Sequence, residues 1–129
     1  MPKGRLKLFF DGGCRPNPGT MELAVVARGV VYHQPDMGHG TNNDAEWLAL
    51  IHALEIAHSL GATEIELVGD SALVVNQAAG LWKCRGADLR EHHDTFTSLA
   101  DRFSRIRIRH VKRSQNLAGI ALSKRRDGL

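Results

Sequence analysis

The stretch EIELVGDSALVVNQ, residues 64–77, decides the fold class, because a pattern typical of a buried strand passes directly into a helical pattern. EIELVGD at 64–70 predicts a short strand, and SALVVNQAAGLW at 71–82 predicts a helix that begins at Ser71, a residue type that caps helices. A strand followed at once by a helix is typical of α/β folds. The boundary also places Asp70 at the tip of the strand, where loops leave room for a ligand.

The chain before this unit predicts three strands. RLKLFF at 5–10 alternates and ends in apolar residues, so we expect a strand that delivers Asp11 to its own C-terminal tip. MELAVVARGVV at 21–31 predicts a second strand, which turns near Gly29 into a third strand ending near Gln34. These three strands are expected to form an antiparallel meander.

Residues 42–60 change to a helical period, with apolar side chains recurring at steps of three and four. Gly61 supplies a left-handed stop, and Glu46 falls in the expected first turn. The start of this helix is marked by three residues with capping side-chain oxygens, Asn42, Asn43 and Asp44.

Three further elements complete the chain. We expect a helix over 87–103, a strand over 105–111 with one basic face, and a short helix over 114–125. The order βββ-α-β-α-α-β-α predicts an α/β fold with a mixed five-stranded sheet. In that sheet, two parallel strands add to the three antiparallel N-terminal strands, and helices pack on both faces.

Composition sets bounds on the class of protein. A chain of 129 residues with 43% hydrophobic and 24% charged residues fits one globular domain over 1–129, which we expect to be a monomer. Cys14 and Cys84 form no CxxC pair, so neither a disulfide framework nor a zinc site is expected. No apolar run approaches the roughly 20 residues of a membrane span, and the N-terminus lacks a signal-peptide core, so a cytoplasmic location is expected. The net charge of +3 suits a polyanionic partner, although a solvated basic surface explains it equally well.

Three carboxylates are the candidate reactive groups. Asp11, Glu46 and Asp70 are expected to meet at one edge of the sheet, where they would repel one another unless cations neutralise them. Mg²⁺ and Mn²⁺ prefer such oxygen ligands, and two ions roughly 3.5–4 Å apart can support cleavage of a phosphodiester. Taken singly, each acid also has a structural explanation as a turn residue, a helix-dipole partner or a cap.

Four sequence blocks, in this order and spacing, resemble the signature of the type 1 ribonuclease H family. They are DGGCRPNPG at 11–19, TNNDAEWLAL at 41–50, GDSALVVNQ at 69–77 and HVKRSQN at 110–116. The resemblance implies a ribonuclease H-like fold and metal-dependent hydrolysis of the RNA strand of RNA/DNA hybrids, leaving 5′-phosphate and 3′-hydroxyl ends. It implies two Mg²⁺ or Mn²⁺ ions bound by the three carboxylates.

The same resemblance implies contacts to the shallow minor groove and the 2′-hydroxyls of the hybrid. The matching residues are Cys14, Asn17, Asn42 and Asn43, and the blocks also supply Gly12, Gly13, Arg15 and Ser71 as substrate-binding candidates. For Asn17 the alternative is that it shapes its proline-rich loop.

The chain departs from the family where most members carry a fourth acid. An ungapped match puts Ile120 at that position, and Asp127 lies too far along. Asn116 is the best candidate for a neutral catalytic stand-in, since an amide oxygen can ligate a hard cation. The alternatives are that the second metal is held weakly, or that Asn116 only makes a cap or loop hydrogen bond.

Other departures concern binding. Arg113 stands where some members have a mobile histidine, and a cation there can pair with released phosphate. The basic helical insertion of some relatives is missing, so Trp82 and Lys83 are the nearest candidates for contact with the DNA strand, although Trp82 fits a plain core residue as well. Among the histidines, His92 and His93 are expected to be solvated and His110 partly buried.

Two rival functions stay open. The missing fourth acid favours a weak or silent ribonuclease H fold that binds nucleic acid without cutting it. A 3′-exonuclease of the wider superfamily would trim from one end.

Overall fold

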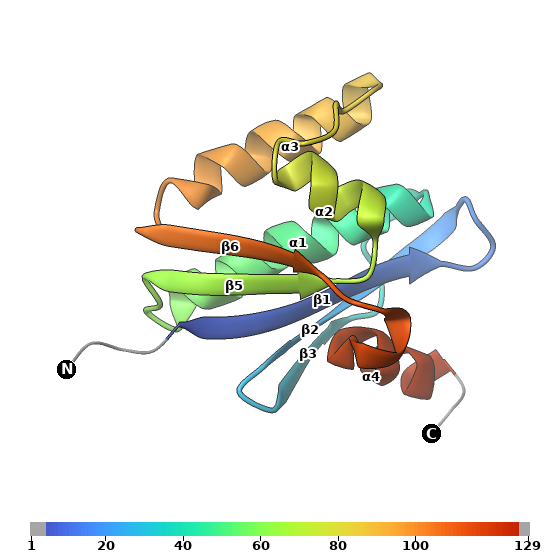
Figure 1. Cartoon of the computed structure of the whole chain (residues 1–129). Coiled ribbons are helices and arrows are strands. Elements are labelled where there is room, and N and C mark those ends of the chain that lie inside the picture. Colours follow the sequence, from blue (N-terminus) through green and yellow to red (C-terminus); the bar gives the residue numbers. More distant parts are fainter. Residues whose placement is uncertain (1–4, 127–129) are drawn as a thin grey trace.

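A mixed sheet forms the centre of the molecule, which we describe from a computed structural model covering residues 5–126 (Figure 1). The sheet order is β3-β2-β1-β5-β6, with β4 paired to β2. The elements along the chain are β1 (Leu6–Cys14), β2 (Gly19–Ala27), β3 (Val30–Gln34), β4 (His39–Gly40), α1 (Asn42–Ser59), β5 (Glu64–Gly69), α2 (Ala72–Ala78), α3 (Ala87–Ala100), β6 (Arg105–His110), the 3₁₀ turn η1 (Arg113–Gln115) and α4 (Leu117–Arg126).

The strand directions confirm the predicted mixed sheet. β1, β2 and β3 pair antiparallel, and β5 and β6 add to β1 in parallel. The two-residue strand β4 is an addition that the sequence pattern did not predict. A two-residue strand carries too little periodic signal to be recognised.

β1 continues past its predicted end. The expected strand over 5–10 runs on to Cys14, and Asp11 pairs with Ala24 of β2. Asp11 therefore lies inside a strand and not at its tip, because β2 extends the ladder across the Gly-Gly turn signal. Asp70 follows β5 directly, as predicted.

Helices cover both faces of the sheet, as expected. Leu8, Phe10 and Leu23 point to one face and pack in the main core with α1, whose fully buried Trp47 is the largest side chain of that core. On the other face, α4 packs on β1 and β2 through a smaller cluster that contains Ala24, Val26, Ala118 and Leu122. Figure 1 shows α4 apart from the α1, α2 and α3 group.

Helix boundaries differ from the predicted ones at four places, one of which is the end of α3 at Ala100, three residues early. α1 is capped by Thr41 in a capping box with Asp44, not by the asparagines, so Glu46 lies in the second turn. α2 begins after Ser71 as predicted but stops at Ala78, four residues early. Asn116 breaks the last predicted helix into η1 and α4.

Two other expectations concern cysteine and membrane segments. Cys14 and Cys84 are both free thiols. Among the helices of residues 5–126, none is both long and apolar enough to cross a membrane. Asp127 lies outside the described residues.

Candidate active site

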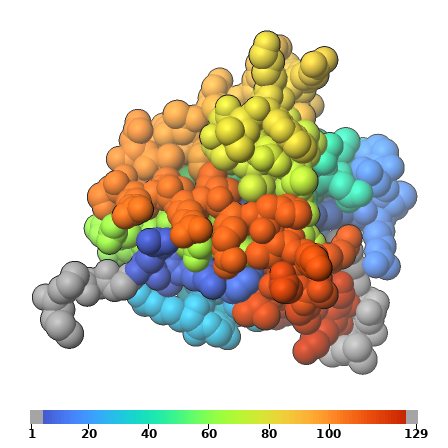
Figure 2. Space-filling view, viewed as in Figure 1, coloured from blue at the N-terminus to red at the C-terminus, as the bar shows by residue number. Residues whose placement is uncertain are grey.

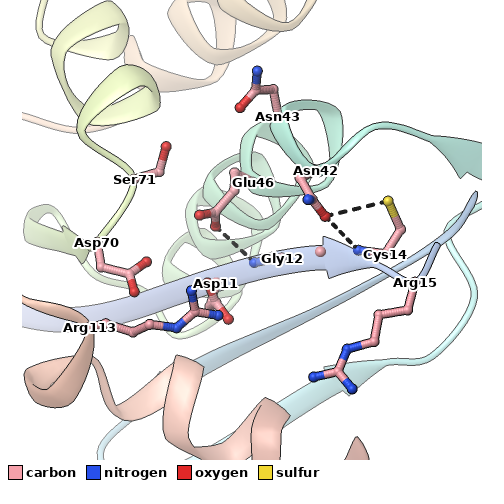
Figure 3. A pocket seen from close by; sticks show the side chains of 11 residues that line it. Asp11, Gly12, Cys14, Arg15, Asn42, Asn43, Glu46, Asp70, Ser71 and Arg113 are labelled. Carbon is pink, nitrogen blue, oxygen red and sulfur yellow. Dashed lines mark hydrogen bonds between the residues drawn. The ribbon is translucent and has the colours of Figure 1, made fainter. Parts of the chain in front are cut away.

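Three carboxylates meet at the edge of the sheet beside the start of α1. One oxygen from each of Asp11, Glu46 and Asp70 lies within 4.8 Å of the others. Asp11 comes from β1, Glu46 from α1 and Asp70 from the turn after β5 (Figure 3). All three line one cleft of about 370 Å³. The predicted convergence of the trio is confirmed.

Close packing of α1 on β1 brings Glu46 into this cluster. Glu46 Oε1 accepts a hydrogen bond of 2.9 Å from the backbone N–H of Gly12. A Cβ at position 12 would overlap the carbonyl oxygen of Ala45, so glycine is required for this approach. The hydrogen bond fixes the Glu46 carboxylate beside Asp11, which is itself 6% exposed.

The electrostatics of the cluster favour binding of a cation. Burial raises the pKa of Glu46 well above its ordinary value, and the negative charge of Asp11 raises it further. The hydrogen bond from Gly12 N–H opposes these effects, and the charge of Asp70 adds to them. Three ionised carboxylates are therefore unfavourable together without a cation, and their hard oxygen atoms are the ligands that divalent metals such as Mg²⁺ prefer.

Polar residues from β1 and the start of α1 form one rim of the cleft. The Cys14 backbone N–H donates to Asn42 Oδ1 at 2.9 Å, and the Asn42 N–H donates to Asn17 Oδ1 at 3.1 Å. These bonds tie the end of β1 and the loop after it to the start of α1. Figure 3 shows Asn42, Asn43 and Cys14 along this rim, with Arg113 reaching in beside Asp11 and Asp70.

Eleven of the fifteen residues singled out from the sequence line this one cleft. They are Asp11, Gly12, Gly13, Cys14, Arg15, Asn42, Asn43, Glu46, Asp70, Ser71 and Arg113. Asn17 braces the rim from behind, and Ser71 Oγ caps α2 by accepting from Val74 N–H at 3.2 Å.

Asn116 makes two hydrogen bonds that dock the start of α4 onto β1. Its Nδ2 donates to the carbonyl oxygen of Phe10 at 3.0 Å, and its Oδ1 accepts from Ala118 N–H at 3.1 Å. The side chain is fully buried, and both amide atoms are engaged within the chain. This arrangement matches the cap alternative, because α4 begins at the next residue. A role for Asn116 as a neutral stand-in for the fourth acid stays a prediction.

The place next to Asp11 on α4 belongs to Gly119. A Cβ at position 119 would lie 3.5 Å from Asp11 Oδ2. Ile120 is 38% exposed and lines a neighbouring cavity that also contains Arg113 and Lys124. Gly119 lies three residues after the capping Asn116, and this helical spacing was the available sequence signal that position 119 faces Asp11.

Trp82 and Lys83 lie apart from the carboxylate cleft. They line a second cavity of about 620 Å³ with Gln77 and His93. Trp82 is 50% exposed, so its reading as a plain core residue was wrong. The segment after α2 is irregular, and this leaves the indole at the surface.

The histidine predictions were also wrong. His92 Nε2 lies 3.1 Å from Asp44 Oδ1, and its ring stacks on Trp47, while the ring of His93 meets Trp47 edge-on. His110 is exposed at the end of β6, with Nε2 3.2 Å from the Asp70 carbonyl oxygen. These contacts join segments far apart in the sequence, so periodicity within one helix could not reveal them.

Comparison with known proteins places this fold and cleft in a family. The family model described as "Reverse transcriptase-like" matches residues 9–126. Ribonuclease HI of Halobacterium salinarum is 40% identical over 125 residues, covering 93% of this chain. The crystal structure of RNase H1 from that archaeon has a TM-score of 0.88 and 36% identity, covering 98% of this chain and 100% of that one.

Two other relatives extend the comparison. LC11-RNase H1, solved in complex with an RNA/DNA hybrid, has a TM-score of 0.79 and 30% identity over 88% of this chain and 89% of that one. The bifunctional protein Rv2228c of Mycobacterium tuberculosis is 38% identical over 112 residues, covering 82% of this chain.

The chain is shorter than the curated relatives that it matches. It spans 63% of the length of the Halobacterium protein and 31% of the length of Rv2228c. The matched portion nevertheless includes the strands, the helices and all three clustered carboxylates. By sequence and by fold, this chain belongs to the type 1 ribonuclease H family.

Proposed function

We propose that this chain is an endonuclease that hydrolyses the RNA strand of RNA/DNA hybrids, leaving 5′-phosphate and 3′-hydroxyl ends. The observation that carries the proposal is the carboxylate trio, whose oxygens lie within 4.8 Å of one another in an open cleft. A relative with 30% identity and the same fold was solved with an RNA/DNA hybrid, which supports the substrate class.

The trio fits a pair of divalent cations, and we infer Mg²⁺ or Mn²⁺. Asp11, Glu46 and Asp70 would hold them, since their oxygens are hard donors. Burial, and then the charge of Asp11, raises the pKa of Glu46, and a cation would neutralise that charge. When bound, such ions supply an activated water and stabilise the leaving oxygen of the cleaved phosphodiester.

The rim residues orient the hybrid. Cys14, Asn42 and Asn43 line the cleft, and Asn17 is bonded to Asn42, so this rim would offer backbone and amide groups to the shallow minor groove of a hybrid. Gly12, Gly13, Arg15 and Ser71 complete the substrate-facing wall. Because the 2′-hydroxyl both donates and accepts hydrogen bonds, this wall can distinguish an RNA strand from a DNA strand.

Two groups bind phosphate around the cut. Arg113 reaches into the cleft beside Asp11 and Asp70, where a guanidinium pairs with a phosphate oxygen (Figure 3). Trp82 and Lys83, exposed beside the second cavity, would contact the backbone of the DNA strand.

A second candidate function follows from the start of α4. Asn116 is committed to capping, and Ile120 is apolar, so residues 5–126 place no fourth carboxylate beside the trio. With one ligand charge fewer, the metals would be held less tightly. A fold that binds hybrid and cuts it slowly or not at all is the alternative.

One gel separates these functions. A hybrid with end-labelled RNA is incubated with the protein in Mg²⁺ and, separately, in Mn²⁺, with Asp70→Asn as the matched inactive control. Internal RNA fragments that only the parent chain produces support the endonuclease. Stepwise shortening from one end would identify an exonuclease instead, and retained binding without fragments under either metal would leave only the binding protein.

Three further expectations stay predictions. A single domain over 1–129, a monomeric state and a cytoplasmic location each rest on the sequence alone.

A further inference from the structure

β6 carries three arginines on one face at the edge of the sheet. Ile106 and Ile108 pack against the main core on the side of α2 and α3, so Arg105, Arg107 and Arg109 alternate with them onto the opposite face. The arginine side chains are exposed, at 60% for Arg107 and 42% for Arg109. The pleat of a strand therefore aligns three guanidinium groups along one outer surface.

The nearly buried carboxylate of Glu66 forms ion pairs with the basic side chains of this surface. Glu66 of β5 lies 3.3 Å from Arg109 Nε, 3.8 Å from Arg107 Nε and 4.0 Å from Lys7 Nζ. Its side chain is only 12% exposed, so the cations face outward and the carboxylate lies beneath them. Both arginine pairs run through Nε, so the remaining N–H groups of each exposed guanidinium can bind an external anion while Glu66 stays paired.

We call this surface the arginine face and define it by Lys7, Glu64, Glu66, Arg105, Arg107 and Arg109. Four cations and two carboxylates give it a net charge of +2, most of the +3 of the whole chain. α4 packs on β1, β2 and β3 on this side of the sheet. In Figure 2 the β6 segment, in orange, runs uncovered across the face toward the viewer.

The arginine face begins where the carboxylate cleft ends. His110, the last residue of β6, lies 3.2 Å from the Asp70 carbonyl oxygen, and Val111 N–H donates to Gly69 at 3.0 Å. From there the arginines lead away from the cleft at every second residue, roughly 6–7 Å apart. A polyanion leaving the cleft over this edge would meet them in succession.

The stiffness of nucleic acids decides which polyanion fits. A single strand bends freely, so it can leave the cleft and follow the row of arginines along β6. A duplex has a persistence length of about 150 base pairs and stays straight, so it follows that row only where its axis already runs along β6. Arginine also suits phosphate better than lysine does, because its planar fork binds two oxygens at once.

We propose that the arginine face binds single-stranded nucleic acid that continues from the hybrid held in the cleft. This inference rests on the proposed function, since it takes the hybrid as the substrate of the cleft. It extends the substrate class from a plain hybrid to a hybrid with a single-stranded extension. The contact is to phosphates and carries no sequence preference.

Fluorescence anisotropy on matched substrates tests the proposal. All proteins carry Asp70→Asn to keep the RNA intact, and the probes are a blunt hybrid, the same hybrid with a single-stranded extension, and the single strand alone. We expect the extension to tighten binding about tenfold at low salt, and to steepen the dependence of log K on log salt by about 2, since each phosphate contact to a single strand contributes about 0.7.

Three triple variants show whether the gain from the extension depends on the arginine face. Arg105→Gln/Arg107→Gln/Arg109→Gln should abolish the gain from the extension and leave binding of the blunt hybrid unchanged. The matching lysine variant should keep most of the gain, because it keeps the charges. Arg28→Gln/Arg102→Gln/Arg125→Gln removes three exposed cations elsewhere and should keep all of it.

Three results would overturn the proposal. One is an extension that adds nothing to binding, and another is a gain that survives the triple glutamine change. The third is a glutamine variant that aggregates with its gain intact, which would mean that the arginines only guard an edge strand against pairing with another chain. Failure of the proposed function looks different: blunt hybrid is then neither cut by the parent chain nor bound, while the single strand alone still binds through the arginines.

Discussion

On one face of β1, Glu46 of α1 accepts a hydrogen bond from the backbone N–H of Gly12; on the other face, Asn116 before α4 donates one to the carbonyl oxygen of Phe10. Both side chains sit near the start of a helix, and both dock that helix onto the strand that carries Asp11. The first docking residue is a carboxylate that lines the cleft, and the second is a neutral amide that is fully buried.

The difference shows how a docking residue can also become a ligand. One oxygen of Glu46 suffices for the bond to Gly12, so the rest of the carboxylate remains part of the trio. The amide of Asn116 donates to Phe10 and accepts from Ala118, so both of its polar atoms take part in docking α4. On the α1 side of β1 the docking residue therefore also belongs to the trio, whereas on the α4 side the docking residue Asn116 is structural and the carboxylate belongs to Asp11 of β1.

The largest effect should come from removing the charge of one carboxylate of the trio. Asp70→Asn keeps the size of the side chain but removes one ligand charge, so RNA cleavage should fall by about 1,000-fold or more, since a metal supplies several kcal/mol of transition-state stabilisation. Initial rates on labelled hybrid measure this, with Asp101→Asn, an exposed acid outside the cleft, as the control. Undiminished turnover in Asp70→Asn would place the metal site elsewhere.

The next effect concerns stability on the neutral side. Asn116→Ala leaves the Phe10 carbonyl and the Ala118 N–H buried without partners, so the free energy of unfolding should fall by about 2–3 kcal/mol. Asn116→Asp should also destabilise, because a carboxylate cannot donate to Phe10. Urea denaturation measures both, and Asn43→Ala, at an exposed position, should change stability by less than about 0.5 kcal/mol. A stable Asn116→Asp chain with tighter metal binding would contradict the cap assignment.

The same contrast separates what the sequence could predict from what it could not. Local sequence signals were enough to predict a helix boundary where the residue that sets the boundary is next to it in the chain. Ser71 caps α2 directly after Asp70, and Gly61, with a φ of +75°, follows the end of α1. The trio was identified because whole sequence blocks around it resembled a family, not because any single acid was distinctive.

The predictions failed where the partner is far away in the chain. β1 continues past Asp11 because β2 pairs with it there. Asn116 is held at the start of α4 because its Nδ2 donates to the carbonyl oxygen of Phe10, 106 residues earlier. His92 meets Asp44 across 48 residues. Such pairings depend on tertiary packing, which periodicity and propensity do not encode.

Adding a carboxylate to α4 tests whether this helix can also contribute a metal ligand. Ile120→Asp puts a carboxylate on α4 beside the cavity that contains Gly119 and Arg113. Because an ungapped match puts position 120 where most family members carry an acid, the affinity for Mn²⁺ measured by calorimetry should rise about tenfold, since each added charged oxygen ligand strengthens a hard-cation site. Leu117→Asp, at another exposed apolar position of α4, is the control. Equal affinities in both variants would mean that α4 is too far from the site to contribute.

The smallest effect is a pH dependence within the first turns of α1, where two acids shift in opposite directions. Burial, then the charge of Asp11, raises the pKa of Glu46. Burial alone would raise the pKa of Asp44 too, but hydrogen bonds from the Thr41 backbone and side chain and from His92 outweigh it and lower that pKa.

The signs of these two shifts give two separate pH windows. Between the ordinary and the raised pKa of Glu46, the unfolded chain loses a proton that the folded, metal-free chain keeps, so stability falls as pH rises through that window. Asp44 contributes stability above its ordinary pKa, and that contribution is lost as pH falls through its lowered value. Thermal melts of the metal-free protein from pH 3 to 8 should show both.

Two isosteric variants show which acid produces each pH window. Glu46→Gln should flatten the upper window and raise the melting temperature at neutral pH by a few degrees, and Asp44→Asn should flatten only the lower one. Mn²⁺ affinity should rise with pH through the upper window, because Glu46 must lose its proton to bind a metal. A melting curve in which Glu46→Gln leaves the upper window intact would mean that another titratable group, and not Glu46, produces that window.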